Sequence, residues 1–228
     1  MGKVEVAVHY EDGQVLVLEK PPGMPSQKDY SRALDVESWA RNHTGGEMFL
    51  VHRLDRPVGG LMVLAKDKRS AALLSKEFAG HQAEKEYLAV ACGAAASQGS
   101  CRDHLHKGRG NRSEVVEAGK PGAKEAVLHY RLLETREVDG EPLSLLEIRL
   151  ESGRHHQIRV QLANARLPLW GDTKYNPRFQ DWKGWVRIGL FSSRLRFIHP
   201  GTGRRMEFAV QPKGFPFDLF EIAAPDPL

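Results

Sequence analysis

Short apolar segments joined by tight turns constrain the fold of this chain more than any other feature of its sequence. Val4–Val8 and Val15–Leu18 flank the turn EDGQ, and Val127–Leu133 and Leu143–Leu150 flank the turn EVDGEP. Two strands joined by a short turn pair antiparallel, whereas parallel neighbours need a crossover of about a dozen residues or more. We therefore expect an α+β fold, with a mostly antiparallel mixed sheet flanked by helices and loops.

Other segments are consistent with this expectation. The continuous apolar run Leu61–Ala65 predicts a buried central strand. Residues 93–122 are rich in Gly, Ser, Ala and charge, and predict a long loop with little strand. Further strands are expected at residues 49–51, 87–90, 186–190, 195–198 and 206–210.

Three segments have the spacing of amphipathic helices. They are residues 32–43, the segment that follows the capping residue Asp67, and the segment after Gly153. Their apolar positions, which we expect to be buried, are Leu34 and Trp39 in the first, Ala71, Leu74 and Phe78 in the second, and Ile158, Leu162 and Ala165 in the third.

The chain of 228 residues shows no repeat, low-complexity segment or linker. We therefore expect one catalytic domain over residues 1–228. No apolar run approaches the ~20 residues that a bilayer-spanning helix needs, and the N-terminal residues lack the pattern of a secretory signal, so a cytoplasmic location is expected. In that compartment Cys92 and Cys101 stay free thiols.

Positive charge is concentrated in one stretch. The net charge of +4 and the pI near 9.1 permit a polyanionic partner without requiring one. The stretch CRDHLHKGRGNR carries Arg102, Lys107, Arg109 and Arg112 against the single acid Asp103, whereas the final stretch GFPFDLFEIAAPDPL contains no Lys or Arg. Local positive charge of this kind suits a surface that follows phosphates, although a solvated loop explains it equally well.

The stretch HRLDRPVGGL places a carboxylate on a shaped loop. Pro57 stiffens the turn after Asp55, and Gly59-Gly60 lets the backbone bend or approach another group closely before the buried strand. Loops held on a rigid scaffold often carry functional side chains. Asp55 is therefore a candidate nucleophile, and an ordinary surface ion pair is the alternative.

Two further stretches carry candidate binding groups. In LESGRHHQIRVQL, Arg154 and Arg159 lie at or just inside the start of a helix, where cations do not offset the helix dipole. Surface ion pairs are the alternative. In AEKEYLAV, Lys85 and Tyr87 share one face of a strand, so the ring can stack on a base while the lysine meets a phosphate. A tyrosine packed in the sheet is the alternative.

No competing catalytic or metal pattern occurs in the sequence. It contains no P-loop, GxGxxG, HExxH or GxSxG motif, and the spacing of its cysteines and histidines matches no common zinc site. The adjacent rings of His155 and His156 are expected to diverge on a helix and so not to share a metal. We expect neither a cofactor nor a metal.

Taken in order, five stretches resemble the motifs of the RluA-type pseudouridine synthases. VHRLDRPVGGLMVLAKD is similar to the HRLD signature of that family, LEKPPGMPSQ to its Lys-Pro-x-Gly motif, and EKEYLAVACG to its Lys-x-Tyr strand. LESGRHHQIRVQLANARLPLWGDTKY resembles its TGRxHQIR and GDxxY stretch, and LRFIHPGTGRRMEFAVQPKGFPF its closing His-Pro hairpin. The matches run from about Val15 to Phe217 and cover most of the chain.

The resemblance implies the pseudouridine synthase catalytic fold and an enzyme that isomerises selected uridines of rRNA or tRNA without cofactor or metal. It implies that Asp55 is the catalytic residue, that Tyr87 contacts the target base, and that Arg159 pairs with Asp55. An ionised carboxylate can attack and leave, or stabilise a detached base, and which of these applies stays open. With the cations noted above, the residues expected to bind RNA are His52, Arg53, Lys85, Arg102, Lys107, Arg109, Arg112 and Arg154.

The sequence departs from the family pattern near the expected site. Val58 and Gly59 stand where Thr and Ser are usual, Ser152 replaces the usual Thr, and Gln161 stands where a His is common. None of these positions is an implied catalytic residue, so we expect activity. We expect no S4-like RNA-binding domain before the first strand, and we expect target choice to come from the domain itself, including the basic loop Arg102–Arg112.

Two other functions stay open on the sequence alone. The VGG stretch after Asp55 supports a non-catalytic RNA-binding protein of the same fold. A glycoside or nucleoside hydrolase would use Asp55 with a second carboxylate, for which Glu151 and Asp172 are candidates. A monomer is expected, because the sequence shows no long exposed apolar segment that would need burial against another chain.

Overall fold

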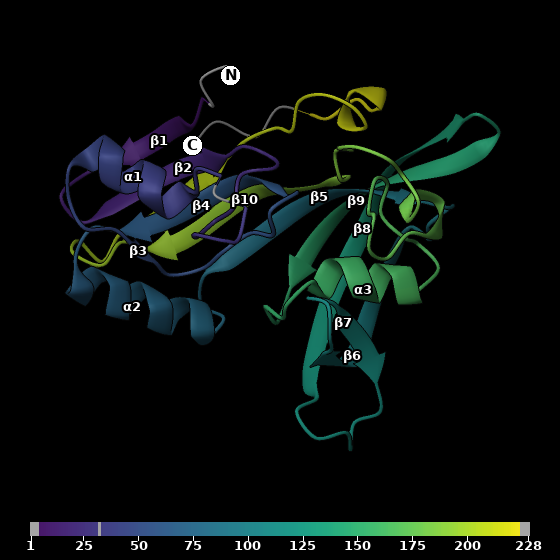
Figure 1. Cartoon of the computed structure of the whole chain (residues 1–228), viewed down its shortest axis with the longest axis horizontal. Helices are drawn as coiled ribbons and strands as arrows, with labels where there is room; N and C mark the ends of the chain where they lie inside the picture. Colours follow the sequence, from purple (N-terminus) through teal and green to yellow (C-terminus); the bar gives the residue numbers. More distant parts are fainter. Residues whose placement is uncertain (1–4, 32, 224–228) are drawn as a thin grey trace. The chain divides into compact units, whose positions relative to one another are not determined.

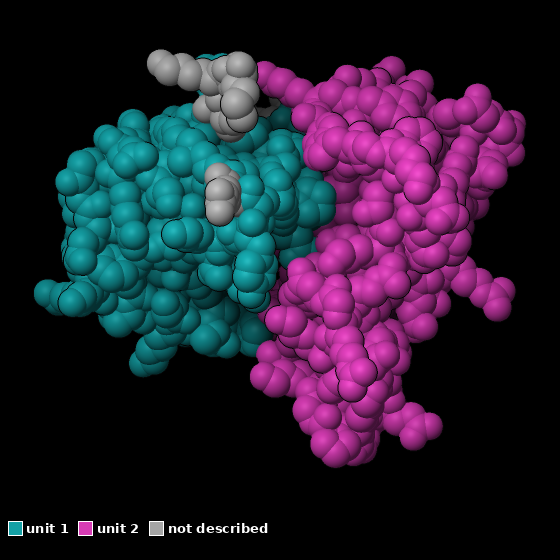
Figure 2. All heavy atoms as spheres, viewed as in Figure 1, with its two compact units in different colours: residues 1–85, 191–212, 224–228 teal, residues 86–190, 213–223 magenta. Residues whose placement is uncertain are grey.

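The structure, a computed structural model, describes residues 5–31 and 33–223. Its internal contacts divide the chain into two compact units, which Figure 2 colours separately. Unit 1 combines the chain up to Lys85 with Phe191–Pro212, and unit 2 combines Glu86–Leu190 with Lys213–Ala223. The expectation of one catalytic domain over residues 1–228 stays a prediction.

Unit 1 is organised around the apolar run that the sequence marks as central. All seven residues of β4 (Gly59–Ala65) are buried. A Cβ on Gly60 would lie 2.2 Å from the carbonyl oxygen of Ser192, so only glycine allows the close parallel pairing of β4 with β10 there. Neighbouring strands run β1-β2-β4-β10, with β3 also on β4 and β11 on β10. The strands besides β4 are β1 (Ala7–Glu11), β2 (Val15–Lys20), β3 (Phe49–Leu50), β10 (Leu190–Ile198) and β11 (Arg205–Ala209).

Two capped helices belong to unit 1 and lie beside its strands (Figure 1). Helices α1 (Val36–Thr44) and α2 (Lys68–Ala79) begin where the side chains of Asp35 and Asp67 accept hydrogen bonds from backbone N–H groups of the first turn. Leu74 and Phe78 of α2 pack with residues of β2, β4, β10 and β11 in one buried apolar cluster. The cap at Asp67 and the apolar face of α2 are confirmed.

Unit 2 is built from antiparallel hairpins, with neighbouring strands in the order β5-β9-β8-β6-β7. Helix α3 (Gln157–Asn164) lies against β6 and β7, and its Val160 packs with Leu105 and Ala126 (Figure 1). The other elements are β5 (Glu84–Cys92), β6 (Gln98–Lys107), β7 (Ser113–Val116), β8 (Lys124–Val138), β9 (Glu141–Leu150) and the short 3-10 helices η1 (Pro177–Phe179) and η2 (Phe217–Leu219).

The predicted α+β fold with a mostly antiparallel mixed sheet is confirmed, since β4 and β10 pair in parallel and the other pairs named above are antiparallel. The long loop predicted over residues 93–122 is wrong. Residues 98–107 and 113–116 form β6 and β7, and the basic stretch 102–112 is part of their hairpin. Leu105 is the only buried residue of β6, so the strand lacks the apolar alternation by which strands are recognised in a sequence.

Several predicted boundaries also differ from the structure. Leu34 precedes the cap of α1 and is exposed, Trp39 is only half-buried and stacks on His43, and Ala165 is the exposed residue that ends α3. Leu34 lies before the N-cap of α1 and Ala165 is the C-cap of α3, so neither lies within a helix. Trp39 lies within α1 but on a half-buried face.

The predicted strands at 186–190 and 195–198 are one strand that begins at Leu190. The residues before it are held by single backbone hydrogen bonds, such as those between Gly189 and Trp170, and not by a ladder. The first strand begins at Ala7, and residue 4 lies outside the described residues. Among the described helices, none has the length and apolar character needed to span a membrane.

Candidate active site

The loop that carries Asp55 connects β3 to β4 and is fixed by the backbone on both sides of that residue. The Ser26 hydroxyl donates to the Leu54 carbonyl at 2.7 Å and accepts from the Leu54 N–H at 3.2 Å. The Gly23 N–H donates to the Arg56 carbonyl at 2.8 Å, and the Val58 N–H donates to the Asp55 carbonyl at 3.0 Å. Asp55 itself is half-buried. Its position is therefore determined by the loop of residues 21–26 as well as by its own turn.

A fully buried lysine joins these two loops. Lys20, at the end of β2, donates through Nζ to the carbonyls of Met24 at 2.7 Å, Arg56 at 3.1 Å and Pro21 at 3.2 Å. Burial lowers the pKa of Lys20 to about 7, the Asp55 carboxylate opposes that shift, and Arg56 adds to it. The Lys20 ammonium therefore interacts electrostatically with the carboxylate of Asp55, the candidate nucleophile.

Lys20 was not among the predicted site residues. It follows the apolar run Val15–Leu18 by two positions and precedes Pro-Pro-Gly, so the sequence placed it at the junction of a strand and a loop. A cation at the end of a fully buried strand is the signal that could have identified it, because such a group needs acceptors nearby.

His52 has a packing role in unit 1. Its Nε2 accepts the Val63 N–H at 3.1 Å, and its ring stacks on Phe78 with centroids 4.4 Å apart. Burial, and then the charge of Lys85, lowers the pKa of His52 to about 3, so the ring is neutral. Its Nδ1 is buried and has no hydrogen-bond partner in the described part of the chain. A contact of His52 with RNA stays a prediction.

Two other predicted RNA-binding residues of unit 1 differ in their surroundings. Arg53 is exposed, and the structure of residues 5–31 and 33–223 gives it no hydrogen bond or ion pair. Lys85 is half-buried, with Nζ 5.4 Å from the centroid of the Phe78 ring, and burial lowers its pKa. The Arg53 guanidinium is therefore exposed to solvent, whereas the Lys85 ammonium contacts the Phe78 ring.

Arg159 of α3 is held in a buried ion pair with Asp172. Its Nε donates to one carboxylate oxygen of Asp172 at 2.8 Å and a terminal nitrogen donates to the other at 2.7 Å. Asp172 has no exposed surface and also accepts the backbone N–H groups of Lys174 and Tyr175. This geometry fixes the guanidinium in a single orientation. The predicted pairing of Arg159 with Asp55 stays a prediction.

A network of histidine, tyrosine and serine surrounds that ion pair. The Arg159 guanidinium carbon lies 5.4 Å from the Tyr175 ring centroid, and the Tyr175 hydroxyl is 2.9 Å from His156 Nδ1 and accepts the Ser113 N–H at 2.6 Å. Burial, and then the charge of Arg159, lowers the pKa of His156 to about 2. The expectation that the rings of His155 and His156 diverge is wrong: both precede α3, and they stack at 3.8 Å.

Tyr87, the residue implied to contact the base, lies on β5 and is buried, opposite Ile148 of β9. It belongs to unit 2 together with Arg159, whereas Asp55 belongs to unit 1.

Of the basic residues of the 102–112 stretch, Arg102 and Lys107 lie on β6, whereas Arg109 and Arg112 lie in the turn between β6 and β7. Arg102 pairs with the exposed Glu125, and Arg112 donates to the Lys174 carbonyl and lies 5.7 Å from the Tyr175 ring centroid. Lys107 and Arg109 are exposed, and no ion pair involves either of them among the residues that the structure describes. Lys107 and Arg109 are therefore more accessible to an anionic partner than Arg102 and Arg112 are.

The remaining candidates are engaged in the protein's own contacts. Arg154 donates through Nε to the Glu125 carbonyl at 3.0 Å, and Glu151 is exposed and 2.7 Å from His129. Asp172 is committed to Arg159, so neither proposed second carboxylate of a hydrolase has the setting of a general acid. Both Cys92 and Cys101 are free thiols. No group of three or more potential metal ligands occurs within the described ranges.

The sequence and fold match known proteins of one kind. A family model described as RNA pseudouridylate synthase matches residues 14–164. The chain is 30% identical over 226 residues to a ribosomal large subunit pseudouridine synthase D of Zymomonas mobilis, covering 90% of this chain and 68% of that protein. It is 31% identical over 224 residues to a tRNA pseudouridine synthase C of Vibrio parahaemolyticus, covering 90% of each.

Solved structures share the fold. The structure of human RNA pseudouridylate synthase domain containing 1 superposes with a TM-score of 0.76 at 21% sequence identity, over 91% of this chain and 84% of that one. That of human RNA pseudouridylate synthase domain containing 4 gives a TM-score of 0.71 at 22% identity, over 91% and 89%.

Proposed function

Because the chain belongs to the RNA pseudouridylate synthase family, whose members are isomerases, we propose that it converts specific uridines of ribosomal or transfer RNA to pseudouridine with Asp55 as the essential carboxylate. The observation that carries the assignment of Asp55 is its loop. Hydrogen bonds from Ser26, Gly23 and Lys20 to the neighbouring backbone position one carboxylate in advance of any substrate.

The reaction needs a group that can either form and break a bond or stabilise a separated base. The bond from N1 of uracil to C1′ of ribose breaks, a bond from C5 to C1′ forms, the C5 proton leaves, and N1 gains a proton. Atoms and electrons balance, so the product is an isomer and no oxidant is required. An ionised Asp55 can attack the sugar carbon or the ring and then leave, or stabilise positive charge at C1′.

The other two implied catalytic residues have roles that suit their surroundings. Arg159 has a permanent positive charge held rigidly by Asp172, which suits the stabilisation of an anion. Tyr87 is a buried aromatic residue on a strand, which suits a contact with a base that has left its stack. We propose these roles together with that of Asp55.

RNA binding in this proposal relies on exposed cations. Arg53, Lys107 and Arg109 have charges that no described contact compensates, so they can replace counterions on phosphates. The other five predicted residues contact other parts of the protein, and we assign them a smaller contribution to RNA binding. They are His52, Lys85, Arg102, Arg112 and Arg154. The proposal includes a cytoplasmic monomer without cofactor or metal, as the sequence led us to expect.

The decisive experiment compares wild type with Asp55→Asn on unfractionated cellular RNA. We expect wild type to form pseudouridine and Asp55→Asn to form none, while the affinity of the two proteins for RNA stays within about three-fold, because only a charge and not the fold is removed. Pseudouridine is mapped by sequencing, and binding is measured by filter retention.

Two outcomes favour the alternatives. Absence of pseudouridine with wild type, together with RNA binding, identifies a non-catalytic RNA-binding protein. Release of free uracil from RNA or uridine identifies a hydrolase. Mapping total RNA from cells with and without the gene then names the target uridine.

A further inference from the structure

Three large aromatic side chains are exposed on unit 2. Trp182, Trp185 and Phe215 expose 54%, 63% and 48% of their surface. They lie in two segments, 182–187 and 213–217, the second of which ends the His-Pro stretch quoted above. Single exposed apolar residues are ordinary, but a group of large rings on one unit calls for an explanation. We refer to these three residues as the aromatic surface.

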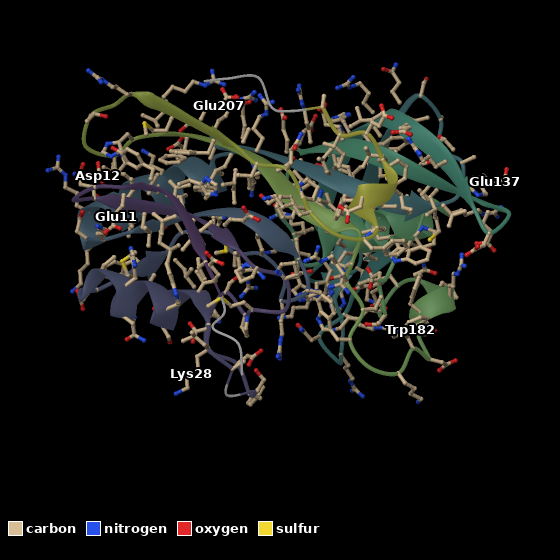
Figure 3. All side chains as sticks on the ribbon, turned by 90° about the horizontal axis from the view of Figure 1, so that it is seen from above. Glu11, Asp12, Lys28, Glu137, Trp182 and Glu207 are labelled. Atoms are coloured by element: carbon tan, nitrogen blue, oxygen red, sulfur yellow. The ribbon has the colours of Figure 1, made fainter. Side chains whose placement is uncertain are left out.

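The aromatic surface rests on one buried ring, Phe179, and one half-buried ring, Trp170. Phe179 is buried and contacts Trp182 on one side and Trp170 on the other, with centroids 5.8 and 4.9 Å apart. Trp170 also contacts Phe215 at 5.2 Å, with the rings 77° apart. Two of the exposed rings are therefore the ends of a continuous aromatic chain, one of which, Trp182, is labelled in Figure 3.

Contacts of Arg187 connect the segment of Trp185, the third exposed ring, to the segments of the other aromatic residues. The Arg187 side chain donates to the Lys213 carbonyl, so the two exposed segments are tied together between Trp185 and Phe215. A Cβ on Gly171 would lie 2.1 Å from the Arg187 carbonyl oxygen, so the segment of Trp185 also packs against the residue that follows Trp170. The structure thus presents the three rings from one connected piece of unit 2.

Exposed lysines lie within these segments, and exposed acids border them. Lys183 and Lys213 are exposed, and the exposed Asp181 and Asp218 flank the two segments. The Asp218 carboxylate accepts the Gly214 N–H at 2.7 Å. Aromatic faces beside exposed lysines suit unpaired nucleotides, because bases stack on rings and phosphates meet the lysines.

We propose that the aromatic surface, with Lys183 and Lys213, binds unpaired nucleotides of the RNA substrate outside the target uridine. The proposal rests on the proposed function, since it takes RNA as the substrate. It assigns an RNA contact to residues distinct from the cations of the β6–β7 hairpin, and it predicts a preference for single-stranded over fully paired RNA.

The test uses a labelled 12-nucleotide oligouridylate as probe and a blunt RNA duplex of the same length as comparison. The double variant Trp182→Leu/Trp185→Leu keeps apolar bulk and removes stacking, whereas Trp182→Phe/Trp185→Phe keeps aromatic rings. We expect the leucine variant to weaken oligouridylate binding by about ten-fold or more and the phenylalanine variant by less than about three-fold. Binding of the duplex should change little in either. Leu73→Ala, an exposed apolar position on α2, is the control for general surface effects.

A second readout does not depend on the leucine variant being well folded. Oligouridylate should quench the tryptophan fluorescence of wild type, and Trp185→Phe alone should remove much of that quenching. Lys213→Gln should reduce the slope of log Kd against log salt by about 0.7, the value for one phosphate contact on a single strand.

Each result bears on one proposal or the other. If wild type forms pseudouridine and the leucine variant binds oligouridylate as wild type does, the inference fails while the proposed function stands. If the variants instead abolish a self-association detected by sedimentation and leave RNA affinity unchanged, the surface is an interface between copies of the chain and the inference is overturned. If wild type forms no pseudouridine but the leucine variant loses RNA affinity, the proposed catalysis fails and the RNA surface stands.

Discussion

Each unit contains a buried cation that belongs to the candidate site: Lys20 near Asp55 in unit 1, and the candidate catalytic residue Arg159 in unit 2. The two units compensate the buried charge in different ways. In unit 1, Lys20 donates to three backbone carbonyls, and the charge of the Asp55 carboxylate raises its pKa. In unit 2, Arg159 forms a two-point ion pair with Asp172, which is itself held by backbone N–H groups.

The difference teaches how the choice of compensating group sets the response to pH. A lysine surrounded by dipoles can lose its proton when burial becomes too costly, and the pKa of Lys20 is accordingly lowered to about 7. An arginine keeps its proton at every accessible pH, so its charge must be matched by a carboxylate. Unit 1 therefore has a charge that titrates near neutrality beside Asp55, whereas the Arg159 guanidinium is permanent.

The largest effect on this comparison is expected from removing the carboxylate of unit 2. Asp172→Ala removes the buried carboxylate that accepts two hydrogen bonds from Arg159, so the free energy of unfolding should fall by about 3–5 kcal/mol. Urea denaturation measures it. Glu125→Ala is the matched control, because it removes the carboxylate of the exposed Arg102 pair and should cost less than about 1 kcal/mol. Equal losses of unfolding free energy in the two variants would show that the buried Arg159–Asp172 pair stabilises the protein no more than an exposed pair does.

Removing the buried amine of Lys20 in unit 1 should have a smaller effect on stability. Lys20→Met leaves the Met24 carbonyl without its 2.7 Å donor, and at pH 9 we expect a loss of about 2 kcal/mol in the free energy of unfolding. Pseudouridine formation should also slow by at least about ten-fold, because the loop next to Asp55 loses a fixed point. The exposed Lys76→Met on α2 is the control, with a change within about 0.5 kcal/mol. Normal turnover in Lys20→Met would remove Lys20 from the positioning of Asp55.

The third expected effect is the dependence of that loss on pH, which is of similar size, about 2 kcal/mol over two pH units near neutrality. The folded protein holds the Lys20 proton less tightly than the unfolded chain does, since its pKa falls from 10.5 to about 7 on folding. The unfolded state thus binds more protons between these values, and wild type gains stability relative to Lys20→Met as pH rises from about 7, by at most about 1.4 kcal/mol per pH unit. The cost is fully present below about pH 7. Urea unfolding of both proteins at pH 6.5, 7.5 and 8.5 measures the difference, and a value constant across this range would mean that Lys20 keeps its proton.

The parts of the fold that were predictable are those with local signals. The capping residue Asp67, the apolar run of β4 and the turn between β8 and β9 each act within a few residues, and the structure has them where the sequence indicated. The strand β6 was missed, because its neighbours β7, β8 and α3 supply most of what stabilises it and its own sequence has a single buried residue.

The candidate site divides in the same way. The sequence alone determined the order of the motifs, the identity of Asp55, Tyr87 and Arg159 as candidates, and the glycine pair that begins β4, where a Cβ on Gly60 would clash with Ser192. Only the tertiary structure decided that Lys20 is buried beneath the Asp55 loop, that Asp172 holds Arg159, and that His52 is a neutral packing residue. The physical reason is that burial and pairing depend on groups far apart in the chain: Lys20 meets a carbonyl 36 residues away, and no periodicity within either segment encodes that contact.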